Sequence, residues 1–168
     1  VLNDFVLTAN ISGVTSLDVQ NNEISDLAGI EAFTTLTYLN CSSNSLTILD
    51  LSNNTALEIL DCNNNQLTSL DVSNNTALTN LYCSSNQLTT LDVSANTALI
   101  QLYCNENELT SLDVSNNTAL TLLACNENQL TSLDLSANTI LTGLYCHVNP
   151  LTSLDVNSNT ALTHLQCN

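Results

Sequence analysis

Pairs of apolar residues separated by one other residue recur along most of the chain, at alternating intervals of ten and eleven residues. Residues 81–83 read Leu-Tyr-Cys, residues 91–93 read Leu-Asp-Val, and the next pair begins at Leu102. This alternation points the outer two side chains to one side and the middle one to the other, as in a short β-strand. The pattern therefore predicts two short strands in each repeating unit, of which residues 81–101 are one copy.

One asparagine follows each apolar pair, three residues after its second member, as Asn86 and Asn96 do. Its short amide side chain is suited to bonding the free backbone groups of a turn. Stacked on its copy in the next unit it would form a ladder, so we interpret these residues as structural rather than ligand-binding. The first column is Asn44, Asn65, Asn86, Asn107, Asn128 and Asn149, and the second is Asn54, Asn75, Asn96, Asn117, Asn138 and Asn159.

Seven evenly spaced cysteines mark a 21-residue period: Cys41, Cys62, Cys83, Cys104, Cys125, Cys146 and Cys167. A fixed period of this size is typical of a solenoid. A 21-residue coil that contains two strands leaves only tight connections, which are too short for α-helices. The sequence predicts an all-β solenoid with little or no α-helix, in which two parallel sheets per coil face each other across a core of Leu, Val and Cys.

The template Leu-x-x-Leu-x-Cys-x-x-Asn-x-Leu resembles a leucine-rich repeat with cysteine at a core position. Residues 39–168 are similar to the short, nested 21-residue repeats of bacterial surface and secreted proteins. Residues 17–38 have a 22-residue period and resemble an internalin-like repeat, with one short helical turn expected within 26–33. Residues 1–16 fit neither pattern and are interpreted as an N-terminal cap or domain edge. The last repeat is truncated in mid-repeat, which predicts a fragment of a longer protein or head-to-tail self-association with another copy.

The cysteine column has three interpretations. The template points every Cys into the core, where a free thiol behaves as a small hydrophobe, and we favour this reduced, structural role. Disulfides are the second interpretation, although seven is an odd number and intramolecular pairing cannot consume them all. A soft-metal site is the third, but zinc sites use pairs of Cys only a few residues apart.

Charge excludes several functions. The chain carries 16 Asp and Glu, two His, and neither Lys nor Arg, for a net charge of −16. Without cationic side chains it cannot neutralise phosphates, which argues against nucleic-acid binding and against docking on an anionic membrane surface. No acid–base pair in a concave site can be recognised, so we expect no enzymatic activity.

Aspartates form the central column of the Leu-x-Val half-units: Asp50, Asp71, Asp92, Asp113, Asp134 and Asp155. Unit charges about 4.8 Å apart, the strand spacing, repel by roughly 1 kcal/mol in water. We expect this repulsion to raise some of the pKa values, so that mild acid stabilises the fold, although bonds from Ser and Thr hydroxyls would favour the carboxylates. Binding of Ca²⁺ or Na⁺ at Asp71, Asp92, Asp113 and Asp134 would relieve the repulsion. The alternative is a solvated ladder that keeps the protein soluble.

The outward columns of the Leu-x-Cys sheet vary from coil to coil, whereas those of the Leu-Asp-Val sheet hardly change. Exposed aromatics beside Asn, Gln and His are suited to stacking on sugar rings and bonding their hydroxyls. The alternative is that Tyr merely suits an exposed strand position. The predicted ligand-binding residues are Tyr82, Tyr103, Tyr145, Asn80, Gln101, Asn105, His147 and His164.

These observations predict a non-enzymatic extracellular binding or adhesion module of a bacterial surface or secreted protein, with a glycan or protein ligand on the Leu-x-Cys sheet. The location follows from the family resemblance and the acidity. A structural spacer or filament unit that stacks end to end is the alternative. Threonine columns at the corners also resemble those of ice-binding proteins, but the sheet faces carry strongly hydrated Asp. No cofactor is expected, apart from Ca²⁺ at the aspartates.

Overall fold

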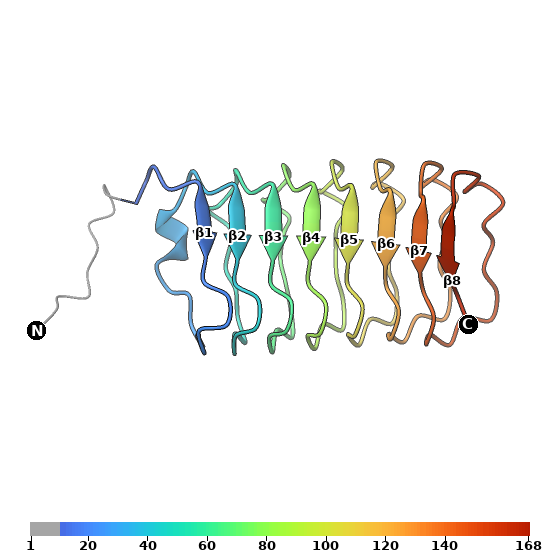
Figure 1. The fold of residues 1–168 in the computed structure, drawn as a ribbon, viewed down its shortest axis with the longest axis horizontal. Coiled ribbons are helices and arrows are strands. Elements are labelled where there is room, and N and C mark those ends of the chain that lie inside the picture. The colour runs from blue at the N-terminus through green and yellow to red at the C-terminus, as the bar shows by residue number, and fades with distance from the viewer. Residues whose placement is uncertain (1–10) are drawn as a thin grey trace, which may run out of the picture.

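The computed structural model describes residues 11–168 as a flattened stack of coils, and the coils contribute eight short strands to one parallel sheet (Figure 1). The strands are β1 (Ser16–Asp18), β2 (Tyr38–Asn40), β3 (Ile59–Asp61), β4 (Asn80–Tyr82), β5 (Gln101–Tyr103), β6 (Leu122–Ala124), β7 (Gly143–Tyr145) and β8 (His164–Gln166). Leu17 pairs with Leu39 across one 22-residue coil, and Leu39 pairs with Leu60 across the first 21-residue coil. No α-helix occurs within residues 11–168, and the predicted all-β solenoid is confirmed.

The predicted second sheet is wrong. Within residues 11–168, no backbone hydrogen bond joins the Leu-Asp-Val segments of neighbouring coils. The backbone N–H groups that follow each segment are used inside their own coil, because Ser73 N–H bonds Asp71 and Asn75 N–H bonds the carbonyl of Val72. The back of the solenoid is therefore a row of turns rather than a β-ladder.

The first coil contains the expected helical turn, a 3₁₀ helix η2 (Ile30–Ala32). Gly29 precedes it with φ 102°, a conformation that glycine adopts without a steric penalty. The Asn54 side chain of the next coil donates to the carbonyls of Ile30 and Phe33, at 2.9 and 3.0 Å. This asparagine joins the 22-residue coil to the 21-residue coils.

Before the first strand, residues 1–10 of the predicted cap (residues 1–16) lie outside the described residues. Residues 11–13 form a turn, and the Thr15 carbonyl accepts hydrogen bonds from Thr37 and Tyr38 N–H. β1 begins at Ser16, so this last residue of the predicted cap already belongs to the sheet and pairs with Tyr38 of β2.

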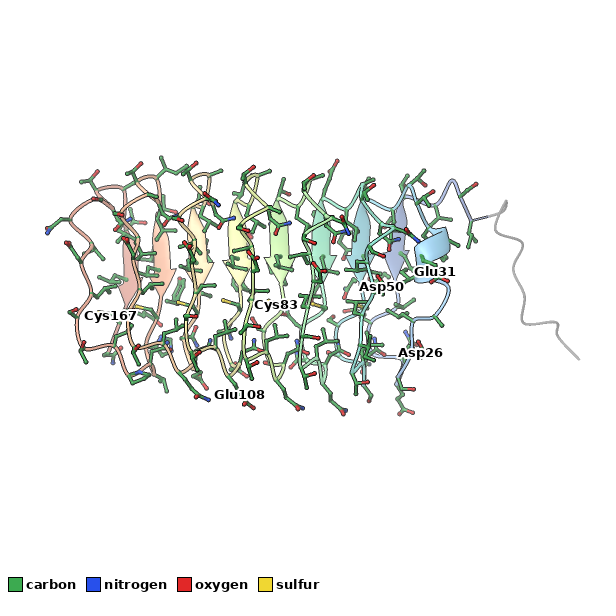
Figure 2. All side chains as sticks on the ribbon, turned by 180° about the vertical axis from the view of Figure 1, so that it is seen from behind. Asp26, Glu31, Asp50, Cys83, Glu108 and Cys167 are labelled. Atoms are coloured by element: carbon green, nitrogen blue, oxygen red, sulfur yellow. The ribbon has the colours of Figure 1, made fainter. Side chains whose placement is uncertain are left out.

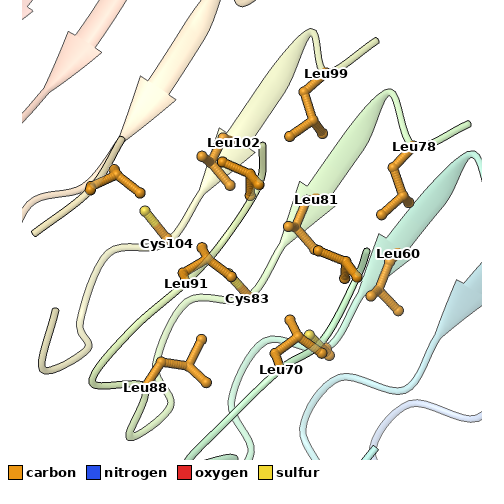
Figure 3. Packing of buried hydrophobic residues seen from close by; sticks show 14 of the residues in the cluster. Leu60, Leu70, Leu78, Leu81, Cys83, Leu88, Leu91, Leu99, Leu102 and Cys104 are labelled. Carbon is orange, nitrogen blue, oxygen red and sulfur yellow. The ribbon is translucent and has the colours of Figure 1, made fainter. Parts of the chain in front are cut away.

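Leucine and cysteine columns fill the core (Figure 3). The strand leucines Leu39, Leu60, Leu81, Leu102, Leu123 and Leu144 have no exposed surface. Six of the seven cysteines are buried beside them, and all seven are free thiols. The Cys62 and Cys83 thiols donate to carbonyls of the next coil, with sulfur–oxygen distances of 3.4 Å. Cysteine thus adds a weak hydrogen bond to the packing that valine would provide.

Cys167 is the last member of the cysteine column and Leu165 is the strand leucine of β8, but Cys167 is exposed and Leu165 is 44% exposed. They belong to the coil of β8, the end strand of the sheet, and no other coil of residues 11–168 packs over them.

The first asparagine column bonds each coil to its neighbour through side chains. Asn86 Nδ2 donates to the carbonyls of Cys62, Cys83 and Ser84, at 3.1–3.2 Å, and its Oδ1 accepts the N–H of Leu67 at 3.0 Å. Each such residue therefore ties together backbone groups of two consecutive coils inside the core.

The second asparagine column is bonded less completely. Asn96 Nδ2 donates to the carbonyls of Val72 and Asn75, at 3.0 and 2.9 Å, while its buried Oδ1 has no protein partner. Both carbonyls also accept a backbone N–H of their own coil. No backbone group depends on Asn96 alone.

We expect Asn86→Ala to destabilise the protein more than Asn96→Ala. The first substitution leaves the buried Leu67 N–H without a partner, which costs roughly 1–3 kcal/mol, whereas the second orphans no backbone group. Urea denaturation of the two variants measures both free energies of unfolding. Equal losses would show that the first column has no special bonding role.

Thiol reactivity tests the core. Burial raises the pKa of the Cys41 and Cys104 thiols to about 12 and that of Cys146 to about 11. A native sample should therefore react quickly with one equivalent of a thiol reagent, at Cys167, and unfolding should release seven. Cys167→Ser should remove the fast equivalent. Rapid reaction of two or more native thiols would contradict this packing.

Candidate functional site

Two adjacent tyrosines occupy the middle of the outward sheet face. Tyr82 ends β4 and Tyr103 ends β5, and the paired register places them side by side. Their ring centroids lie 5.2 Å apart with the planes inclined by 49°, a spacing at which aromatic pairs attract each other. Partial burial is the main reason why the pKa of the Tyr103 hydroxyl is raised, and electrostatic interaction with Tyr82 and then Tyr145 adds to it.

Amide side chains hold one of these rings in place. Asn80 Nδ2 donates to Tyr82 Oη at 2.8 Å, and Tyr82 Oη donates to Gln101 Oε1 at 2.9 Å. Asn80 Nδ2 also lies 3.1 Å from Gln101 Oε1, while Thr79 Oγ1 donates to Asn80 Oδ1. The bonds form a closed network across two coils, so the tyrosine surface is fixed before any ligand arrives.

The aromatic column is interrupted at the next coil. Ala124 takes the position of the tyrosines and is 4% exposed. The flank carries Gly143 in β7, where a Cβ would lie 3.5 Å from Leu122 Cγ. The face therefore changes from a tyrosine ridge to small and apolar residues before Tyr145, two coils beyond Tyr103.

The remaining predicted residues lie outside the hydrogen-bonded network of the tyrosine pair. Asn105 is on the opposite flank, where its Oδ1 accepts a hydrogen bond of 2.6 Å from Ser84 Oγ. His147 follows β7, and its Nδ1 is buried without a protein partner. His164 begins β8 and its Nδ1 lies 2.9 Å from Thr163 Oγ1. The structure brings together Asn80, Tyr82, Gln101 and Tyr103, and separates these four from Tyr145 and both histidines.

The aspartates on the back have pKa values that differ from those expected from the sequence. The carboxylates of Asp71, Asp92 and Asp113 each accept two hydrogen bonds from the serine two residues later, one from its hydroxyl and one from its backbone N–H. Both bonds lower the pKa values of these carboxylates, and the hydroxyl has the larger effect. The N–H contributes first for Asp50 and Asp134, whose pKa values are also lowered. The expectation that repulsion raises these pKa values is wrong, because the local hydrogen bonds outweigh it.

The predicted cation site lacks a cluster of ligands in the described part of the chain. Within residues 11–168, no three Asp, Glu, His or Cys side chains lie close enough to hold one metal ion together. Asp71, Asp92, Asp113 and Asp134 are instead distributed one per coil along an exposed face. Binding of Ca²⁺ there remains a prediction.

Ile48 is an exposed apolar residue that the sequence did not lead us to predict as part of a site. Ile48 is 77% exposed at a back corner where the equivalent positions are Ser69, Thr90, Ser111, Ser132 and Ser153. The signal that could have found it is the departure of this one corner residue from its copies in the other repeats.

The aspartate bonds predict acid destabilisation. Because the pKa of Asp92 in the folded protein lies below the unfolded value near 3.8, folding favours the ionised form. Its contribution is complete above that value and is lost as the pH falls through the folded pKa. The melting temperature should fall between pH 5 and about pH 3, and fall less in the triple variant Asp71→Asn, Asp92→Asn, Asp113→Asn, which keeps the acceptor oxygens. A melting temperature that rises on acidification would restore the repulsion account.

Comparisons with known proteins agree with this architecture. The family model "Leucine Rich repeats (2 copies)" matches residues 55–96, and the "LVIVD repeat" model matches residues 37–61 and 102–127. Internalin J of Listeria monocytogenes is 47% identical over 52 residues, which cover 31% of this chain and 6% of that protein.

Solved structures match along nearly the whole chain. The functional domain of InlJ from Listeria monocytogenes, described as including a cysteine ladder, is 43% identical with a TM-score of 0.77, over 96% of this chain and 41% of that one. The Listeria internalin InlF is 28% identical with a TM-score of 0.87, over 95% and 50%. A leucine-rich-repeat protein of Leptospira interrogans is 26% identical with a TM-score of 0.85, over 92% and 43%.

The chain thus spans half or less of the length of these relatives. No helix within residues 11–168 is long and apolar enough to cross a membrane. The repeat pattern, the parallel sheet and the matched structures lead to one assignment: the chain is a leucine-rich-repeat protein of the bacterial type with short nested repeats.

Proposed function

We propose that the chain is a non-enzymatic, extracellular adhesion module of a bacterial surface or secreted protein, and that it binds a protein ligand on the sheet face over β4 and β5. The likeness to internalins supports a binding role and a surface location. The observation that carries the proposal is the tyrosine pair with its amide network, because it places two adjacent aromatic rings in a fixed arrangement on the variable sheet face.

The chemistry of the pair favours a protein over a glycan. Sugar recognition needs aromatic rings together with polar groups that are free to bond hydroxyls. Here the Tyr82 hydroxyl, Asn80 and Gln101 bond one another, and the two rings are inclined rather than coplanar. A rigid aromatic surface whose Tyr82 hydroxyl is already bonded within the protein resembles the buried centre of a protein interface, where Tyr is enriched.

Ligand capture tests the proposal. Immobilised wild-type protein and the double variant Tyr82→Ala, Tyr103→Ala are probed on a surface-protein array and on a glycan array, with and without Ca²⁺. We expect binding to at least one protein probe, and at least about a tenfold loss of affinity in the double variant, because a central tyrosine typically contributes more than 1 kcal/mol.

The matched control is Thr90→Ala, Ser111→Ala, which alters two exposed residues on the opposite face and should leave binding unchanged. Equal binding by the wild type and the tyrosine variant would contradict a ligand site at the tyrosine pair, and no capture by any probe would favour a structural spacer. Capture by glycans alone would contradict a protein ligand.

A further inference from the structure

The back of the solenoid has a hollow where the 22-residue coil meets the first 21-residue coil. Its volume is about 290 Å³, and it lies between residues 25–31, which include the start of η2, and residues 47–50. A neighbouring hollow of about 250 Å³ continues along residues 48–52 toward Asp71 and Asn74. The two share Ile48, Leu49 and Asp50, so they form one groove.

Similar hollows recur along the back, which supplies an internal comparison. Those between later coils are lined by one leucine, two aspartates and short hydroxyl side chains, for example Leu91, Asp92, Asp113 and Ser111. Only the groove at the coil junction has an isoleucine at the corner position. Ile48 is 77% exposed and absent from the core cluster, so the folding of this chain does not account for it.

Carboxylates border this isoleucine. Asp26, Glu31 and Asp50 line the hollow, and Figure 2 shows all three at the N-terminal end of the back face. Each is held by a backbone N–H at 2.8–2.9 Å, from Ala28, Gly29 and Ser52 respectively. The chain contains no Lys or Arg, so none of its own side chains carries a permanent cation that could pair with them.

We propose that the groove centred on Ile48 binds a short segment of another protein, in which an apolar side chain is flanked by Lys or Arg. The apolar side chain packs on Ile48 and Leu49, and the cationic groups pair with Asp26, Glu31 and Asp50. The surface lies on the opposite face from the tyrosine pair, so it is a second docking site. Charge complementarity selects the partner: fixed anionic groups around an apolar centre favour a basic segment.

A metal ion is not the occupant that this groove fits. Within residues 11–168, these carboxylates do not form a group of three that could hold one ion. The three carboxylates are distributed around an apolar centre, so each can pair with a separate cationic group of one extended segment.

Peptide titrations followed by NMR test the proposal. The probes are acetyl-Gly-Arg-Leu-Arg-Gly-amide and the matched peptide with Ser in place of Leu, added to ¹⁵N-labelled protein at about 0.15 M salt, where long-range attraction is screened. Amide shifts should concentrate at residues 25–31 and 47–50. The Leu peptide should bind about fivefold more tightly, the ratio expected from partial burial of one leucine side chain.

Two sets of variants separate this site from general acidity. Ile48→Ser introduces the residue that other repeats carry at that corner, and should abolish the preference for the Leu peptide. Asp26→Asn with Glu31→Gln retains the acceptor oxygens, and should weaken both peptides more than Asp113→Asn with Asp134→Asn, which removes the same charge elsewhere. Shifts spread evenly along residues 71–134, an unchanged preference in Ile48→Ser, or equal effects of the two charge variants would each overturn the proposal.

Discussion

From β2 onward each coil is hydrogen-bonded to the next in a fixed 21-residue register, and most features of this molecule depend on that constraint. Like residues lie on like residues, so leucine stacks on leucine and cysteine on cysteine through the whole core. A substitution in such a column has to fit both neighbouring coils. Only outward positions on the sheet and at the corners are free to differ, and both proposed binding surfaces lie there.

The two faces of the solenoid are stabilised differently. On the sheet face, Cys83 N–H bonds the Tyr103 carbonyl at 2.8 Å and equivalent bonds follow in successive coils. On the back, the N–H groups at the turns bond within their coil, and asparagine amides make the connections between coils. The sheet therefore offers a fixed platform, while the back consists of turns separated by grooves. This difference explains why the tyrosine pair is rigidly held, and why the exposed isoleucine lies beside a hollow.

The sequence was sufficient to predict the columns but not their hydrogen bonds. Spacing identified the buried leucines, cysteines and asparagines because a strict period allows little else at those positions. The alternation in Leu-Asp-Val was the same as in Leu-x-Cys, yet it forms no ladder. Alternation reports which way side chains point, whereas pairing depends on whether backbone N–H groups are already used, as those of Ser73 and Asn75 are.

At the candidate sites too, the repeat register could be predicted from the sequence, whereas local side-chain contacts could not. The aspartate pKa values depend on a contact two residues away, Asp92 with Ser94, which a count of like charges ignores. The tyrosine pair could be predicted from the register, because Tyr82 and Tyr103 occupy the same position in consecutive repeats. Its network with Asn80 and Gln101 could not, since it depends on side-chain rotamers. The groove at Ile48 arises from the meeting of two coil types, which no single repeat contains.

Amide hydrogen exchange tests the central claim, that no backbone hydrogen bonds join the Leu-Asp-Val segments of neighbouring coils. The N–H groups of Cys62, Cys83 and Cys104 bond the next coil at 2.8 Å, whereas those of Asp71, Asp92 and Asp113 make no backbone bond to a neighbouring coil. The account predicts slow exchange for the three cysteines and exchange faster by orders of magnitude for the three aspartates. Equal protection of the two sets would mean that a second sheet exists, and would contradict the account.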